Sequence, residues 1–340
     1  MPQLSNRCLV AQLAPNLRAV LGTPRPLRYD RSGDPASVLP PYVRAASAIR
    51  RQGARLVVVQ DDTLALAVLD VPAGSIEPVL LPDSPNGARV FDDLRGNKAL
   101  KLDLEACVAL PDGRLVALGS GSSPRRERIV VLAAPVAGST GEVRVPTLVD
   151  ASDWYAELRS HAEAQGAELN VEGAVIQGAR LRVVQRGHGK RPNTHWNAIV
   201  DFTLDDFLDW LDRRGATPRA CALLEVRLGE SRDGVPFGFT DAAVMQDGRL
   251  AFLACAEDSV DVRSDGPILG CRFGWIDPDD ASVLVTDVLE SDRRPTVLKL
   301  EGMETRLDDP RAFDVVADMD RPEEPALHAE LRVDWVSEPA

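Results

Sequence analysis

The sequence predicts an all-β protein, a β-propeller of about five four-stranded blades, and three observations lead to this fold class. A pattern recurs along the chain: an acid, a small residue, an apolar strand, a glycine-containing turn, then Arg-Leu and a second strand. Short apolar runs rich in Val, Leu and Ala are frequent, whereas helical periodicity is scarce. The copies lie 58 to 69 residues apart, which suits one blade of roughly 40 to 50 residues plus loops. We therefore treat residues 1–340 as a single propeller domain.

Each copy of the repeat starts at an anchor residue, and four of the five anchors are acids. The anchors are Ser47, Glu105, Glu172, Asp241 and Glu301. An alanine or glycine follows every anchor, as expected where inner strands crowd around a central axis. Asp112-Gly113 and Asp247-Gly248 are strong hairpin signals, because tight turns of this kind need a positive φ.

Only three strands are predicted after Glu301, the last at 327–335, so the fifth blade lacks one strand. We expect residues 7–13 to supply it and to close the ring, which would remove an exposed sheet edge. A sixth, irregular blade built from residues 14–45 is the alternative. Two segments, 153–165 and 204–214, carry apolar residues at helical spacing and are expected to be helical decorations of the surface.

Composition excludes several functional classes. The chain has 44% hydrophobic and 27% charged residues and a net charge of -13, so nucleic acid is not expected as a partner. No apolar stretch is long enough to span a membrane, and no signal peptide is recognisable. The five cysteines are scattered and lie mostly inside apolar runs. We expect them to be buried reduced thiols, and the protein to be cytoplasmic.

The anchors are expected to meet at one mouth of the central channel. The second strand of an antiparallel hairpin ends beside the start of the first, so the polar residues that end these strands should lie there too. Carboxylates so close together repel one another unless a cation compensates, and their hard oxygens suit Ca²⁺ or Mg²⁺. The predicted ligands of a Ca²⁺ ion are Glu105, Glu172, Asp241, Glu301 and Asp318. A purely structural ring of acids, waters and arginines is the alternative.

Two loops around this mouth are predicted to contact an anionic substrate. Residues 119–123 form a Gly/Ser turn followed by arginines, which can hold an oxyanion. Residues 186–197 form a basic loop, in which Arg186 and His188 are the predicted catalytic residues, His188 as general acid or base. The alternative for residues 119–123 is an ordinary turn, and the alternative for residues 186–197 is a solvated loop without a functional role. The predicted substrate-binding residues are Lys101, Ser120, Ser122, Asp61 and Lys299.

The acid–small pairs, together with Glu301-Gly302-Met303 and the late stretch 315–320, resemble the phytase-like and esterase-like propeller families. The stretch 104–122 looks like an uncharacterised bacterial branch of that group. This resemblance implies a calcium-associated propeller and a hydrolase activity. The Asp-rich phosphate and calcium signatures of true phytases are not evident, so phytase activity itself is not implied.

These observations predict a propeller whose acidic mouth binds Ca²⁺ and hydrolyses an ester of a small anionic metabolite, with water polarised by the metal as nucleophile. No nucleophile elbow and no His-Glu-x-x-His motif is present, which disfavours serine and zinc hydrolysis. The alternative is a non-catalytic propeller that binds a ligand or an unknown protein partner, because this fold serves both roles.

Overall fold

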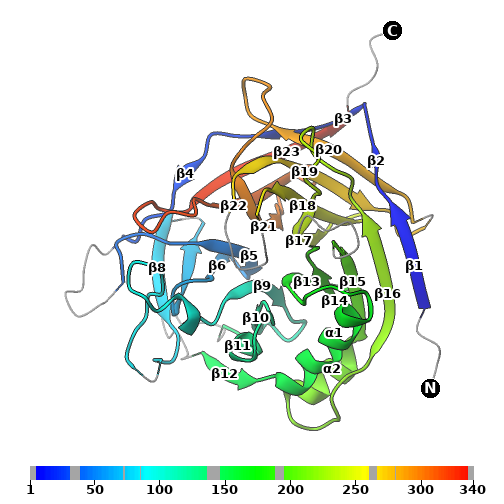
Figure 1. Cartoon of the computed structure of the whole chain (residues 1–340). Coiled ribbons are helices and arrows are strands. Elements are labelled where there is room, and N and C mark those ends of the chain that lie inside the picture. The colour runs from blue at the N-terminus through cyan, green and yellow to red at the C-terminus, as the bar shows by residue number, and fades with distance from the viewer. Residues whose placement is uncertain are drawn as a thin grey trace.

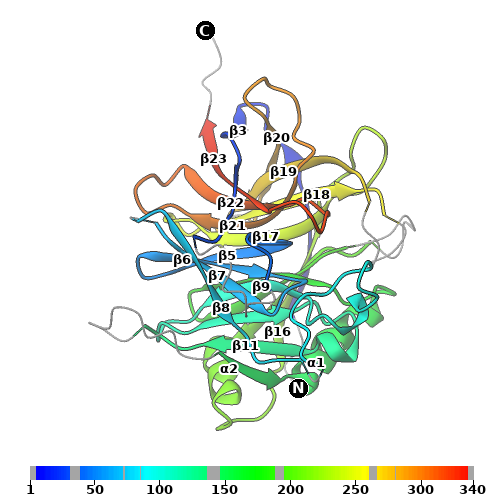
Figure 2. The same ribbon diagram turned by 90° about the vertical axis from the view of Figure 1, so that its left-hand side faces the viewer.

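Each of the first four sequence repeats folds as one antiparallel, four-stranded blade, and the fifth repeat supplies three strands of another. The computed structural model describes residues 5–30, 39–71, 73–84, 86–135, 146–187, 195–259, 266–279 and 281–335. Figure 1 looks down the axis around which the blades are arranged, and Figure 2 shows the ring from the side. The prediction of an all-β propeller of about five blades is confirmed, and residues 14–45 build no sixth blade within the described part of the chain.

The first three blades follow the chain in order from the innermost strand outward. Blade 1 contains β5 (Ala46–Gln52), β6 (Arg55–Gln60), β7 (Ala65–Asp70) and β8 (Ser75–Leu80). Blade 2 contains β9 (Leu104–Ala109), β10 (Leu115–Gly119), β11 (Arg128–Leu132) and β12 (Thr147–Asp150). Blade 3 contains β13 (Val171–Gln177), β14 (Arg180–Gln185), β15 (Ala198–Thr203) and β16 (Ala220–Arg227).

The fourth blade is also continuous in sequence, whereas the fifth borrows its outer strand from the beginning of the chain. Blade 4 contains β17 (Gly238–Val244), β18 (Leu250–Glu257), β19 (Ile268–Ile276) and β20 (Val283–Leu289). Blade 5 contains β21 (Lys299–Thr305), β22 (Ala312–Asp318), β23 (Leu327–Trp335) and the borrowed strand β3 (Leu17–Leu21). The five inner strands β5, β9, β13, β17 and β21 each pack against the next, and β21 packs against β5. The ring is therefore closed.

The strand that completes blade 5 is not the predicted one. We expected residues 7–13, but β3 pairs antiparallel with β23, from Leu21 opposite Leu331 to Leu17 opposite Trp335. Residues 7–13 instead form β1 (Ser5–Val10), parallel to β16, and β2 (Gln12–Leu13), parallel to β20. Figure 1 shows this segment along the outside of blades 3 and 4. The short β4 (Arg25–Pro26) also pairs with β23.

This arrangement predicts a graded response to truncation. Deleting residues 1–13 removes β1 and β2 but leaves four strands in every blade. Deleting residues 1–22 also removes β3, which exposes the edges of β23 and β20. We expect the longer deletion to lower the melting temperature much more than the shorter one, as measured by circular dichroism. Equal melting temperatures for the two truncated proteins would contradict the assignment of β3 as the closing strand.

The two predicted helices are present, and both contribute side chains to the core. They are α1 (Ser152–Ala164) and α2 (Leu204–Leu211), and two short 3-10 turns cover Lys98–Leu100 and Pro124–Arg126. Trp154 of α1 is fully buried and lies 5.2 Å from Phe207 of α2, ring centre to ring centre. Tyr155 donates a hydrogen bond of 2.6 Å to the carbonyl of Gly119 at the end of β10. The expectation of two surface decorations is therefore wrong, because α1 fills the space between blades 2 and 3 and α2 buries Phe207 and Leu211 in the same core. No helix in the described ranges is long and apolar enough to cross a membrane.

The cysteines depart from the expected set of buried thiols. Cys255 and Cys271 face each other across β18 and β19 and form a disulfide. Cys107 is buried and free, and burial raises the pKa of its thiol to about 12. Cys8 and Cys221 are free and exposed. The expectation of reduced thiols throughout is therefore wrong for the pair, and the expectation of burial is wrong for Cys8 and Cys221.

Candidate functional site at the mouth of the channel

A β-bulge opens the inner strand of each blade and sets the direction of the anchor side chain. In β9 the pairing with β10 skips Glu105, and in β13 the pairing with β14 skips Glu172. The same irregularity falls at Ser47 in β5 and at Glu301 in β21. A bulge inserts one extra residue and re-aims its side chain. The repeat thus places its anchor residues at equivalent points of the ring, where the inner strands begin.

The fourth blade breaks the predicted pattern by one residue. There the bulge falls at Thr240, so Asp241 occupies the position that is alanine or glycine in the other blades. Asp241 is fully buried and forms a bidentate ion pair with Arg50 of β5, at 2.6 and 2.8 Å. It also accepts a hydrogen bond of 2.9 Å from the backbone N–H of Met303. The prediction of Asp241 as a metal ligand at the mouth is therefore wrong, since its oxygens are used inside the channel.

The remaining anchors and their neighbours form one charged cluster, which we call the mouth. Its acids are Asp61, Asp103, Glu105, Glu172, Glu257, Glu301, Asp318 and Asp320, and its bases are Lys101, Arg126, Arg186 and Lys299. These groups come from all five blades, although Asp241, the predicted anchor of blade 4, is not among them. Each of the groups perturbs the pKa of others in the set. The structure places the strand ends at 61, 186, 257 and 318 in the same cluster as the anchors.

Three carboxylates at one side of the mouth lie close enough to share a cation. Asp61, Asp103 and Glu105, the carboxylate trio, can place one oxygen each within 4.8 Å of one another. Glu105 makes no hydrogen bond or ion pair to any residue within the described ranges, and Oδ1 of Asp61 is buried without a partner. Burial raises the pKa of Glu105 well above its usual range, and Asp103 and Asp61 raise it further. The trio is therefore an incompletely compensated group of oxygen ligands.

The bases of the mouth are already engaged by carboxylates. Nζ of Lys101 lies 2.6 Å from Asp103 and also contacts Asp61. Lys299 lies 3.2 Å from Glu301 and 3.1 Å from Asp320. Because each ammonium is already paired with at least two carboxylates, these lysines are not free anion-binding groups in this structure. Both nevertheless line the pocket described below.

Arg186 lies in the wall of the mouth. Its guanidinium is 2.6 Å from Glu257 and 3.4 Å from Glu172, and its Nε has no partner. Asn170 donates a hydrogen bond of 2.5 Å to Glu172. Burial raises the pKa of Glu172 to about 8, against the effect of Arg186. His188, the other predicted catalytic residue, lies outside the described residues.

The Gly/Ser turn is used by the protein itself. Ser120 is fully buried and its hydroxyl donates to Asp103, while Ser122 accepts a hydrogen bond of 2.8 Å from Arg126. Gly121 has a φ of 71° and lies against the Tyr155 ring, where a Cβ would come within 2.6 Å of the ring. Both hydroxyls are therefore engaged within the protein, and neither is free to bind a substrate in the predicted way. The turn instead positions Asp103 of the trio.

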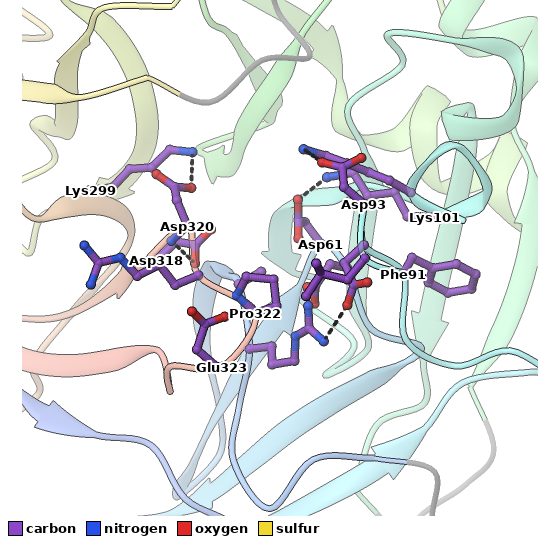
Figure 3. A pocket seen from close by; sticks show the side chains of 16 residues that line it. Asp61, Phe91, Asp93, Lys101, Lys299, Asp318, Asp320, Pro322 and Glu323 are labelled. Atoms are coloured by element: carbon purple, nitrogen blue, oxygen red, sulfur yellow. Dashed lines mark hydrogen bonds and ion pairs between the residues drawn. The ribbon is translucent and has the colours of Figure 1, made fainter. Parts of the chain in front are cut away.

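A pocket of about 380 Å³ opens beside the trio, between blades 1 and 5. Figure 3 shows Asp61 and Lys101 on one side of it and Lys299 and Asp318 on the other. Its only aromatic lining residue in the described part of the chain is Phe91. The volume suits a small ligand, and the charged walls suit a strongly polar one.

Backbone strain gathers at the same place. Six residues other than glycine have a left-handed φ among those described, and three of them belong to the mouth or its pocket: Ala45 at 37°, Asp103 at 56° and Asp320 at 51°. Such conformations cost free energy and tend to cluster at functional sites. The sequence places Asp103 and Asp320 near the mouth but does not predict either as a metal ligand or a substrate-binding residue. Their position next to an anchor or a strand end was the only signal in the sequence.

A family model matches residues 42–333, and its description is a family of unknown function, DUF6929. The chain belongs to this family. Comparison with curated proteins finds no match. The family's matched range runs from just before blade 1 into β23, so it includes every residue of the mouth.

Several solved structures are similar in fold. Glutaminyl cyclase from Myxococcus xanthus is 11% identical, with 98% of this chain and 100% of that chain covered and a TM-score of 0.46. The PQQ-bound aldose sugar dehydrogenase from Streptomyces coelicolor is 12% identical, with 92% and 98% covered and a TM-score of 0.43. The RRP9 WD40 repeats are 8% identical, with 95% and 99% covered and a TM-score of 0.37. At such identities the likeness concerns fold and not activity.

Proposed function

We propose that this protein binds a divalent cation, Ca²⁺ in the first place, at the carboxylate trio and hydrolyses an ester of a small anionic metabolite in the adjoining pocket. The observation that carries the proposal is the incompletely compensated trio: the Glu105 carboxylate makes no hydrogen bond or ion pair with the described residues, and Asp61 has a buried oxygen without a partner. All three donors are hard carboxylate oxygens, which Ca²⁺ and Mg²⁺ prefer. Three side chains leave further coordination positions for water and substrate.

A bound Ca²⁺ would supply Lewis-acid polarisation of the substrate and of a water molecule. The residues of the chain would have separate tasks. Asp61, Asp103 and Glu105 would hold the ion, and Ser120 with Arg126 would fix the orientation of Asp103. The enclosing walls of the pocket would limit the size of the substrate. Glu301, Glu172 and Asp318, which we predicted as ligands, lie outside the trio, and in this proposal they set the negative potential of the mouth.

The first test is calcium-dependent stability. A ligand that binds only the folded state raises its stability by about 2.7 kcal/mol at a hundredfold excess over Kd. We expect millimolar Ca²⁺ to raise the melting temperature of chelator-treated protein, and Glu105→Gln to abolish the increase. Glu301→Gln is the matched control, because it removes one mouth carboxylate without touching the trio, and it should keep the increase.

Activity is tested on a panel of phosphate and carboxylate esters with Ca²⁺ and with chelator. Turnover that needs Ca²⁺ and is lost in Glu105→Gln supports the proposal. Calcium binding without turnover would favour the non-catalytic ligand-binding propeller. If Ca²⁺ and Mg²⁺ leave the melting temperature unchanged, the cation site is refuted.

A further inference from the structure

The ammonium group of Lys101 contacts two of the three carboxylates that a cation bound to the trio would use as ligands. Its Nζ contacts Oδ2 of Asp61 and lies 2.6 Å from Oδ1 of Asp103. The residue is only 7% exposed, so its charge has left water and is balanced by these carboxylates. Glu105, the third member of the trio, is the one that the ammonium leaves without a bond. Lys101 thus acts on two of the three predicted ligands at once.

We propose that Lys101 is a tethered cation that occupies the trio until a divalent ion displaces it, so that this side chain sets how tightly the mouth binds the ion. The proposal rests on the cation site proposed above. A divalent ion needs the same carboxylate oxygens that the ammonium now holds, and two cations cannot share them at bonding distance. Binding of one therefore requires release of the other.

A displaced ammonium has a place to go. Lys101 lines the pocket of about 380 Å³ as well as contacting the trio, and Figure 3 shows it at the pocket wall beside Asp61. A long, flexible lysine side chain can rotate from the carboxylates into this space. The site would then exchange an internal cation for an external one without moving the backbone of blades 1 and 2.

Lys299 offers a matched comparison within the same ring. It also lines the pocket and is held by carboxylates, 3.2 Å from Glu301, 3.1 Å from Asp320 and 3.9 Å from Glu257. It makes no ion pair with a member of the trio among the described residues. Removing either lysine changes the net charge of the mouth by the same amount. Any difference between the two variants therefore reports on direct occupation and not on the overall field.

The experiment measures Ca²⁺ affinity by titration calorimetry on full-length, chelator-treated protein. The variants are Lys101→Met and Lys299→Met, each compared with the parent. In Lys101→Met, Ca²⁺ no longer has to break ammonium–carboxylate hydrogen bonds in order to bind. We therefore expect this variant to bind Ca²⁺ roughly tenfold or more tightly than Lys299→Met does. Lys101→Arg, which keeps a cation at the trio, should not gain affinity over the parent protein.

The outcomes separate this inference from the proposed function. Equal affinities in Lys101→Met and Lys299→Met, with Ca²⁺ bound by both, would overturn the role of Lys101 and leave the cation site standing. Absence of Ca²⁺ binding in every variant would overturn the cation site and the inference with it. Lys101→Gln, which keeps a donor but loses the charge, replaces Lys101→Met if the latter does not fold, and the same affinity gain is expected of it.

Discussion

Replacing Arg50 with methionine should lower the free energy of unfolding by about 3 to 5 kcal/mol, the cost of breaking a buried ion pair from one side. Asp241 is fully buried, and without its partner it must either hold an uncompensated charge or take up a proton, and both cost folding free energy. The same guanidinium also donates to the carbonyls of Ala174, Ala242 and Met303, at 3.3, 2.7 and 2.5 Å. One side chain thus joins four of the five inner strands. Urea unfolding at neutral pH measures the effect.

Two further variants show whether the pair itself is responsible. Arg214→Met removes an exposed arginine that pairs with Asp209 and Asp212, and it should cost about 0 to 1 kcal/mol. Adding Asp241→Asn to Arg50→Met should restore part of the lost stability, because no unpaired charge then remains buried. If Arg50→Met unfolds at the same urea concentration as the parent protein, the pair does not hold the centre of the ring.

In the presence of chelator, the melting temperature should fall steeply as pH rises from about 5 to 9. Burial raises the pKa of Glu172 from 4.5 to about 8, and it raises the pKa of Asp61, Glu105 and Asp318 as well. Between the unfolded and folded pKa values the folded state binds more protons, so stability is greatest below the unfolded value and is lost as pH rises through the folded one. One pKa unit corresponds to about 1.4 kcal/mol. Scanning fluorimetry across this range measures the slope.

The contribution of Glu172 is isolated by Glu172→Gln, which should make the slope shallower and raise stability at pH 9 relative to the parent. Glu163→Gln, at an exposed position of α1, should leave the slope unchanged. Ca²⁺ should stabilise the parent more at high pH than at low pH, because protons and the cation compete for the same carboxylates. A melting temperature that rises from pH 5 to 9 without Ca²⁺ would contradict this picture.

The sequence was sufficient for the five blades because local signals repeat. The Asp-Gly turns mark two hairpins, and both join strands through loops of the same length, with Ala109 opposite Leu115 and Val244 opposite Leu250. Counting back from these turns places Thr240, and not Asp241, at the position in blade 4 that is equivalent to Glu105 in blade 2. The turn position therefore predicts the register correctly, whereas the preference for an acid at the anchor points one residue too far, to Asp241.

Other features depend on contacts that local sequence does not encode. The alternation of buried and exposed residues in Leu17–Leu21 is typical of a strand, yet only the closed ring shows which blade it completes. The disulfide requires the register of β18 against β19. The pairing of Lys101 with Asp61 joins residues 40 positions apart. The sequence predicts that the mouth is acidic, but it does not predict which carboxylates form ion pairs with which bases.

The borrowed strand of blade 5 has a consequence for biosynthesis. Residues 17–21 are made before any blade, and their partners at 331–335 are made after all the others. During translation, blades 1 to 4 can form in turn from neighbouring segments, whereas β3 has no antiparallel partner until the last residues of β23 emerge. Contacts of such long sequence separation form slowly, and until they form the edge of blade 5 is open to other chains. The growing chain is therefore most prone to aggregation after blades 1 to 4 have formed and before β23 is complete, and a chaperone that shields that edge would act in this interval.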